Sequence, residues 1–240
     1  MRYFSLLFSA LAVLLLTSCD PTPPAQQQTS EPADTVKSTE KLLSVEKQAK
    51  PATDGRDVGK AYKLFQQGVG EMKEKKYEAA VSTFLLALES DPENPKIFYN
   101  LGSCYYSLKE YSLALSYFGD AVRFNPSDTS SMIYTGMIHY AQGRIGESIV
   151  SYTKAIEIND QLYMAWYNRG TSYGRLEKYD EAIHDFTAAL TINPSHGNSY
   201  MNRGLAYFYK GETDLACKDW QKAASMGVTV ANDALREHCK

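Results

Sequence analysis

The chain has 240 residues, a formal net charge of −3 and 22% charged residues, the balance of an ordinary soluble surface. Basic residues form no stripe that could hold phosphates, so the sequence argues against a nucleic-acid partner. No histidine (His139, His184, His196 or His238) has a second histidine or a cysteine three or four residues away, so the sequence offers no candidate metal site. The sequence shows no phosphate-binding glycine loop, nucleophile elbow or paired catalytic carboxylate. We therefore expect no catalytic residue, no cofactor and no small-molecule substrate.

Residues 1–18 have the composition of a secretory signal. Arg2 supplies a positive start, and Ser5 to Leu16 is an apolar run too short to cross a bilayer as a helix. The run leads into Leu-Thr-Ser-Cys, which resembles the lipobox of bacterial lipoproteins. This resemblance implies a diacylglyceryl thioether on Cys19, cleavage before it and acylation of its new amino group. The protein would then be anchored by lipid to the inner or the outer membrane of a cell envelope, whereas the alternative is an ordinary cleaved signal.

The segment 19–56 that follows is rich in proline, glutamine, serine and threonine and is almost free of aromatic residues. Such a segment buries too little apolar surface to offset the entropy of ordering it, so we expect a disordered tether. Its root-mean-square span would be roughly 30–35 Å. A weak helix around Glu40 to Lys50 is the alternative for part of it.

From residue 61 onward the same residue classes recur every 34 residues. In the segment 163–196 an aromatic residue, Gly170 and a tyrosine are followed by Ala182, Phe186 and Pro194. The glycine returns at the same place in five successive segments: Gly68, Gly102, Gly136, Gly170 and Gly204. A fixed period of this length indicates a repeat array, and this pattern resembles the tetratricopeptide repeat.

That resemblance implies an all-α fold, a right-handed α-solenoid in which each repeat is a helix-turn-helix. The array would span residues 57–228, and the last helix, 229–240, would cap its apolar end. We place the five repeats at residues 61–94, 95–128, 129–162, 163–196 and 197–228.

The mid-helix glycines need a steric reason, because glycine inside a helix costs about 1 kcal/mol relative to alanine. We interpret them as sites where the paired helix comes close and presents a small residue: Ala80, Ala114, Ser148, Ala182 and Ala216. Pro92, Pro126 and Pro194 are predicted to end the second helices.

The third repeat departs most from the pattern. His139 takes the place of a core tyrosine, where we expect an interior histidine rather than a base, and Gly143 and Gly146 flank its turn. The repeat is either a softer joint in the stack or a tolerated variation of the pattern.

The cysteines other than Cys19 divide into two groups. Cys104 takes a place filled by small residues in other repeats, which predicts a small buried side chain. The place of Cys217 is apolar elsewhere and should face the next helix, which for the last repeat is the cap. An antiparallel cap after Gly227 would bring Cys239 to the level of Cys217, so we predict a disulfide, with two reduced cysteines in contact as the alternative. Closing a loop of this size is worth about 3 kcal/mol by chain entropy.

Resemblance to the family further implies a concave groove, lined by the first helix of each repeat, that receives a segment of a partner protein. One groove position resembles the asparagine ladder by which some members hold a partner's backbone: Gln66, Asn100, Tyr134, Asn168 and Asn202. An amide can donate and accept at once, which suits a peptide group. The neighbouring position adds mostly aromatic contact area: Phe65, Tyr99, Ile133, Tyr167 and Met201. The alternative is that several of these residues pack between repeats. Arg169 and Arg203 either meet acidic groups of a partner or are rim charges without one.

The sequence thus predicts a membrane-anchored scaffold or adaptor of the bacterial cell envelope that binds other proteins in this groove. A structural or assembly subunit of an outer-membrane, secretion or pilus complex is the first alternative. An accessory domain separated from its catalytic half is the second.

Overall fold

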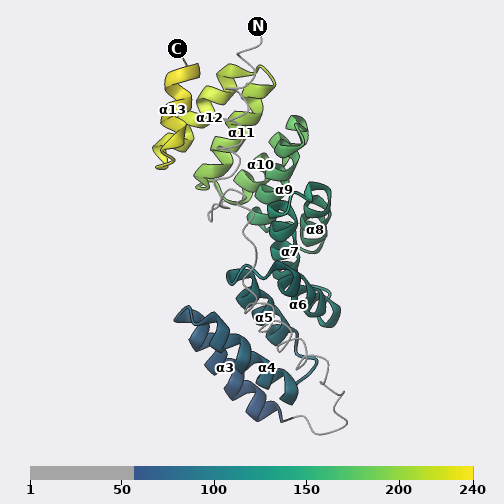
Figure 1. Ribbon diagram of the computed structural model, residues 1–240. Coiled ribbons are helices and arrows are strands. Elements are labelled where there is room, and N and C mark those ends of the chain that lie inside the picture. Colours follow the sequence, from purple (N-terminus) through teal and green to yellow (C-terminus); the bar gives the residue numbers. More distant parts are fainter. Residues whose placement is uncertain (1–56, 240) are drawn as a thin grey trace, which may run out of the picture. The chain divides into compact units, whose positions relative to one another are not determined.

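The computed structural model describes residues 57–239, which contain eleven α-helices and no strand (Figure 1). The predicted signal, Cys19 and the tether through residue 56 lie outside the described residues, as does Lys240. The described residues fall into two compact units, which divide between Pro126 and Ser127. Within residues 57–239, no helix combines the length and the apolar composition that crossing a membrane requires.

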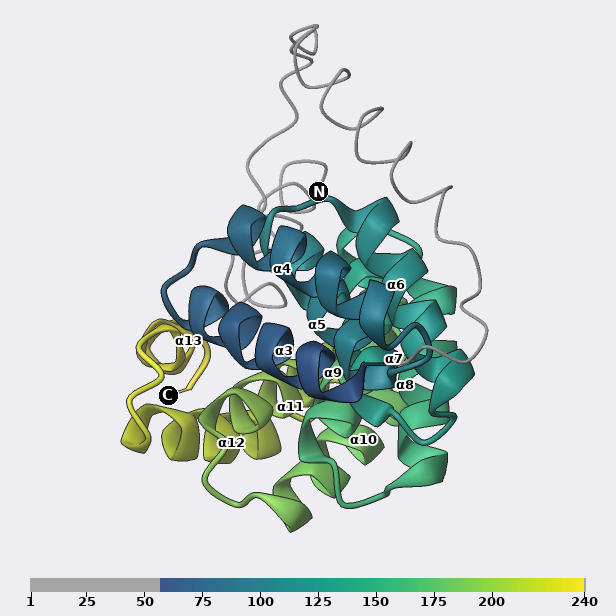
Figure 2. The ribbon, with the colours of Figure 1, turned by 90° about the horizontal axis from the view of Figure 1, so that it is seen from below.

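The first unit, residues 57–126, consists of two helix pairs. Its helices are α3 (Val58–Lys73), α4 (Tyr77–Ser90), α5 (Pro95–Ser107) and α6 (Tyr111–Phe124). Each helix packs against the next one along the chain, as the pairing of α3 with α4 shows in Figures 1 and 2. The first helix of each repeat in this unit, α3 or α5, begins at a residue whose side chain caps it. Asp57 accepts a hydrogen bond from the Lys60 amide, and Asn94 accepts one from the Lys96 amide.

The second unit, residues 127–239, holds three helix pairs and a final helix. Its helices are α7 (Thr129–Ala141), α8 (Ile145–Ile158), α9 (Tyr163–Arg175), α10 (Tyr179–Ile192), α11 (Gly197–Tyr209), α12 (Thr213–Ser225) and α13 (Val230–His238). Consecutive helices again pack together, and α13 lies against α12. The predicted all-α architecture of paired helices is therefore confirmed.

Several helices end just before a proline or a glycine. α4, α6 and α10 each stop two residues before a proline, at Ser90, Phe124 and Ile192. Proline cannot continue a helix and disfavours helical geometry in the residue before it. α12 ends at Ser225, and Gly227 follows with a φ of +86°, the left-handed conformation that commonly closes a helix.

The mid-helix glycines accommodate an aromatic ring. A Cβ on Gly102 would lie 2.7 Å from the ring of Phe118, and one on Gly136 would lie 2.5 Å from the ring of Tyr152. At the other three glycines, the nearest atoms also belong to the aromatic residue at the equivalent position of the second helix: Phe84 for Gly68, Phe186 for Gly170 and Trp220 for Gly204. The paired helix comes close at these glycines, as expected, but the nearest atoms belong to an aromatic ring and not to the small residues; at Gly204 the Ala216 carbonyl oxygen also lies 3.1 Å from the added Cβ. The alanines are fully buried, but the close approach is that of a ring sixteen residues after the glycine.

The turn inside each repeat places one residue in the left-handed region. The residue differs among repeats although the conformation does not: Lys75, Lys109, Gly143, Glu177 and Gly211, with φ between 59° and 82°. A side chain with a Cβ is strained there, and glycine is not. Gly143 in the unusual third repeat is thus the residue best suited to the turn that every repeat makes.

Candidate protein-binding site

In the first unit, the four residues of the predicted groove lie on α3 and α5. Gln66 is exposed, and Phe65, Tyr99 and Asn100 are half-buried. The Phe65 and Tyr99 rings each pack near an aromatic ring of the following helix, with centroid distances of 5.8 Å and 6.0 Å. The Asn100 side-chain amide donates to the Lys96 carbonyl of its own helix at 2.7 Å.

In the second unit, Tyr134 is half-buried on α7, whereas the predicted groove residues of α9 and α11 are buried. The exposed fraction does not exceed 7% for any of them: Tyr167, Asn168, Met201 and Asn202. Tyr167 and Asn202 are brought together across two repeats, because the Asn202 Nδ2 group donates to the Tyr167 hydroxyl at 3.2 Å. Tyr167 and Asn202 therefore pack between repeats, which was the alternative to a role in the groove.

Tyr167 and Asn202 form the centre of a small polar cluster. The Tyr167 ring meets the edge of the His196 imidazole at a centroid distance of 4.7 Å. His196 Nδ1 lies 2.8 Å from Ser199 Oγ, and burial lowers the pKa of His196. Asn202 Oδ1 is buried and has no hydrogen-bond partner among the described residues. An unpaired buried acceptor is costly, and because Asn202 is only 1% exposed, this atom is not accessible to a partner outside the array.

Arg169 and Arg203 have partners inside the chain, which the sequence analysis missed. Arg169 donates to the Asp185 carboxylate from Nε at 2.7 Å and from Nη2 at 3.0 Å. Arg203 binds Asp219 in the same way, at 2.7 Å and 2.8 Å. Each Nη1 group also donates at 3.0 Å to a threonine of the preceding repeat, Thr153 or Thr187. The expectation that these arginines are rim charges or meet a partner's acids is therefore wrong. The recurrence of arginine, aspartate and threonine at steps of sixteen residues in two repeats is the signal that could have revealed them.

The paired aspartates raise the pKa of both arginines. Burial lowers the pKa of Arg169, but the hydrogen bonds and charge of Asp185 outweigh burial, so the net shift is upward. The hydrogen bonds of Asp219 raise the pKa of Arg203 against the same opposition. The Arg169 guanidinium also lies 4.8 Å above the Trp166 ring, whose Nε1 donates to a backbone carbonyl at 2.8 Å. Both arginines are thus held in place by the array.

His139 and His184 each lie beside a carboxylate of the second unit. His139 Nδ1 lies 3.2 Å from Glu147 Oε2, and burial lowers the pKa of His139, with the charge of Arg144 acting in the same direction. His184 is exposed beside Asp185. In the described range, no group of three or more histidine, cysteine, aspartate or glutamate side chains gathers as metal ligands would.

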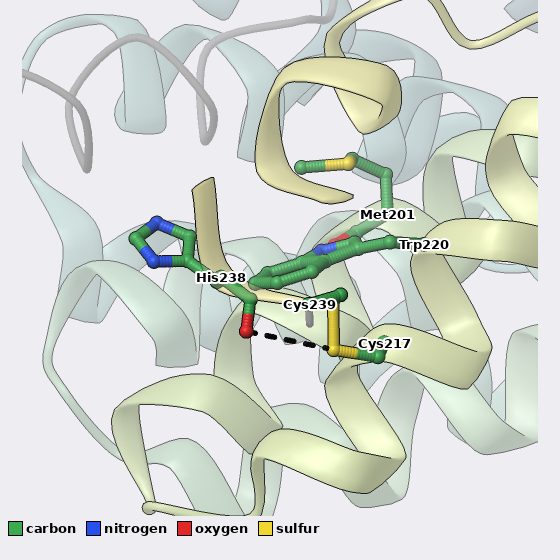
Figure 3. The surroundings of a disulfide bond; sticks show 5 residues. All are labelled: Met201, Cys217, Trp220, His238 and Cys239. Carbon is green, nitrogen blue, oxygen red and sulfur yellow. Dashed lines mark hydrogen bonds between the residues drawn. A yellow bond between two sulfur atoms is a disulfide. The ribbon is translucent and has the colours of Figure 1, made fainter. Parts of the chain in front are cut away.

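A disulfide joins Cys217 of α12 to Cys239, the residue after α13, with a Cα–Cα distance of 5.8 Å (Figure 3). It lies beside the apolar end of the core, where the His238 ring packs 4.4 Å from the Phe208 ring and 5.9 Å from the Trp220 ring. Cys104 is a free, fully buried thiol, and burial raises its pKa to about 12.

Comparison with family models identifies tetratricopeptide repeats in the chain. One model with that description matches residues 95–128 and 163–196, and a second matches residues 136–162. The chain therefore contains tetratricopeptide repeats, and the matched segments overlap the helix pairs of both units. No curated protein matches the chain.

Solved structures with a similar fold include MamA and YrrB. A crystal structure of MamA is 22% identical with a TM-score of 0.64, and the match covers 70% of this chain and 91% of MamA. MamA from Desulfovibrio magneticus RS-1 is 15% identical with a TM-score of 0.65, over 71% of this chain and 96% of that protein. YrrB, described as a TPR protein with an unusual peptide-binding site, is 20% identical with a TM-score of 0.64, over 81% and 97%. At these identities the likeness shows the fold alone.

Proposed function

We propose that this protein is a scaffold that binds other polypeptides through its tetratricopeptide repeats and has no catalytic activity of its own. The observation that carries the proposal is that the groove position stays accessible in the first unit, where Gln66 is exposed and Asn100 is half-buried. An amide side chain can donate to a peptide group of a bound polypeptide and accept from it, whatever the neighbouring side chains are.

The exposed or half-buried groove residues support the same proposal. Gln66, Asn100 and Tyr134 occupy the position of Asn202 in other repeats and combine polar groups with contact area. YrrB, which has the same fold, is described as having a peptide-binding site. A polypeptide partner therefore fits both the chemistry of the position and the fold.

We further propose that a lipid on Cys19 holds the scaffold at a membrane of a bacterial cell envelope. The Leu-Thr-Ser-Cys sequence supports this, although it lies outside the described residues. The Cys217–Cys239 disulfide supports a location outside the cytoplasm, because disulfides persist in oxidising compartments. A tethered scaffold would raise the local concentration of its partners near the membrane.

Site-specific photocrosslinking in intact cells tests the binding site. A crosslinking residue at Gln66, Asn100 or Tyr134 should trap one common set of partner proteins. The same residue at His184, whose side chain is 71% exposed, is the control and should not trap that set. Equal trapping at His184, or no trapping at any of the three groove positions, would refute the proposed site.

Metabolic labelling with a palmitate analogue tests the anchor separately. The label should be lost in Cys19→Ala and retained in Cys104→Ala, whose thiol is buried in the array. Label that remains in Cys19→Ala would contradict lipidation at this residue.

A further inference from the structure

The last helix of the second unit, α13, is attached to the array by little apolar contact. It has nine residues, fewer than the roughly 12–15 below which an isolated helix is marginal in water. Its buried residues are two alanines, Ala231 and Ala234, and Leu235 beside them is half-buried. By comparison, α11 buries the larger side chains of Met201 and Leu205. Apolar packing by itself therefore holds α13 only weakly on α12.

The charged side chains of α13 pair with one another. The Arg236 guanidinium donates to the Asp233 carboxylate, and His238 Nε2 lies 3.7 Å from Glu237 Oε2. Both ion pairs lie within residues 233–238, so they do not hold the helix against the rest of the second unit.

The end of α13 is fixed instead by the Cys217–Cys239 disulfide. The residue before Cys239 is His238, whose ring packs on the rings of Phe208 and Trp220 (Figure 3). Cys217 and Cys239 are both half-buried rather than enclosed, so a thiolate can approach the bond from solvent. The attachment of α13 thus depends on a covalent bond that a reductant can reach.

The helix pair beneath α13 has attachments of its own. Trp220 Nε1 of α12 donates to the Met201 carbonyl of α11 at 3.2 Å. Arg203 of α11 also holds Asp219 of α12 through two hydrogen bonds of 2.7 Å and 2.8 Å. None of these contacts involves α13, so we expect α11 and α12 to stay together when α13 leaves.

We propose that the Cys217–Cys239 disulfide is a redox-operated lock that keeps α13 on the last repeat, and that a dithiol releases the helix. One thiolate of the dithiol attacks a sulfur of the disulfide and forms a mixed disulfide, and the second thiol group then displaces the thiolate of the chain. The dithiol leaves as its own disulfide, while Cys217 and Cys239 gain two electrons and two protons and become thiols.

Without the covalent link, α13 unfolds locally. The His238 ring then leaves the rings of Phe208 and Trp220, against which it packs in the oxidised chain. Because α11 and α12 remain paired, reduction opens this end of the second unit without unfolding it.

Hydrogen exchange measured by mass spectrometry on the full chain, with and without dithiothreitol as the dithiol, tests the lock. In the oxidised chain, the amides of α13 should exchange at least about tenfold more slowly than in an unstructured peptide of the same sequence. After reduction they should exchange within about threefold of the unstructured rate, while the amides of α11 stay protected by at least about a hundredfold.

Two variants assign the response to the disulfide. In the double variant Cys217→Ser, Cys239→Ser, the α13 amides should exchange fast with or without the dithiol. Cys104→Ala, which removes the buried free thiol, should respond as the unsubstituted chain does. Protection of α13 that survives reduction would overturn the proposal, and so would fast exchange of α13 in the oxidised chain. Loss of protection in α11 together with α13 would also overturn it, because the bond would then stabilise the whole helix group and not a separate lock.

Fluorescence provides a second measurement. The chain has two tryptophans, so Trp166→Phe leaves Trp220 as the reporter. Reduction should increase the quenching of Trp220 by acrylamide, because the His238 ring no longer packs near its ring. Quenching that is unchanged by reduction would contradict the release of α13. Neither measurement needs a partner protein, so the result is independent of the crosslinking experiment.

Discussion

The Arg169 guanidinium holds the Asp185 carboxylate through two hydrogen bonds of 2.7 Å and 3.0 Å, and this pair joins α9 to α10. Only 2% of the Asp185 side chain is exposed, so neither charge can regain water if the other is removed. Arg203 and Asp219 repeat the arrangement between α11 and α12. The two pairs bind successive helices of the second unit together.

Asp185→Asn should therefore lower the free energy of unfolding by about 3 kcal/mol, because it leaves Arg169 buried without its counter-charge. Urea denaturation followed by circular dichroism measures the change. Asp180→Asn is the control: its carboxylate pairs with Lys210 but is 78% exposed, and little change is expected. The double variant Arg169→Met, Asp185→Leu should recover part of the loss, and a double variant no more stable than Asp185→Asn would contradict this account.

Gly102→Ala should destabilise the first unit by about 1–3 kcal/mol, since the new methyl group would lie 2.7 Å from the Phe118 ring. Gly119→Ala in α6 is the matched control, because nothing lies within 4 Å of a Cβ at that position. The control should raise stability by up to about 1 kcal/mol, the helix preference of alanine over glycine. Chemical denaturation of both variants measures the difference, and equal effects would show that the ring does not require the glycine.

Lys109→Gly should stabilise the protein by about 1 kcal/mol. Lys109 has a φ of 65°, which strains a residue with a Cβ but not glycine. Lys109→Ala keeps the strain and should show no such gain. A rise in the urea midpoint for both variants would mean that loss of the lysine side chain, not relief of backbone strain, is responsible.

The second unit should lose stability as the pH falls below about 6.5, the ordinary pKa of histidine. Burial lowers the pKa of both His139 and His196 in the folded chain, so the unfolded chain binds protons more readily. The histidines therefore contribute stability above pH 6.5 that is lost as the pH falls toward their lowered pKa values. Urea midpoints measured from pH 7.5 to 5.5 should fall, and the fall should be smaller in His196→Gln. An identical fall in that variant would exclude a contribution from His196.

Breaking the Cys217–Cys239 disulfide should lower stability by about 3 kcal/mol, because the bond links residues 22 positions apart and restricts the unfolded chain. The melting temperature should fall when a reductant is added. In the double variant Cys217→Ser, Cys239→Ser the melting temperature should already be low without reductant, and the reductant should not change it. If the reductant still lowered the melting temperature of the double variant, the Cys217–Cys239 disulfide would not be the cause of the effect.

The all-α class, the positions of the helices and the repeat pattern could be predicted from the amino-acid sequence alone. These depend on local chemistry: apolar residues three and four apart form a helix face, and Pro92, Pro126 and Pro194 stop the helices that precede them. The 34-residue period then implies that the same helix pair is built again, as the starts of α9 at Tyr163 and α11 at Gly197 show. The candidate groove residues came from the resemblance to the tetratricopeptide repeat, which implies a groove lined by the first helix of each repeat.

Which side chains contact one another could not be predicted, because it depends on how the helices pack in three dimensions. Periodicity shows that Gly102, Ala114 and Phe118 face the same interface, but the packing of α5 on α6 makes the Phe118 ring the nearest neighbour of Gly102. In the same way, the stacking of α9 and α11 buries Tyr167 against Asn202, and the approach of α10 to α9 gives Arg169 its partner in Asp185. These contacts depend on the distance and rotation between helices. Both are set by the summed packing of all their side chains, and no local pattern specifies them.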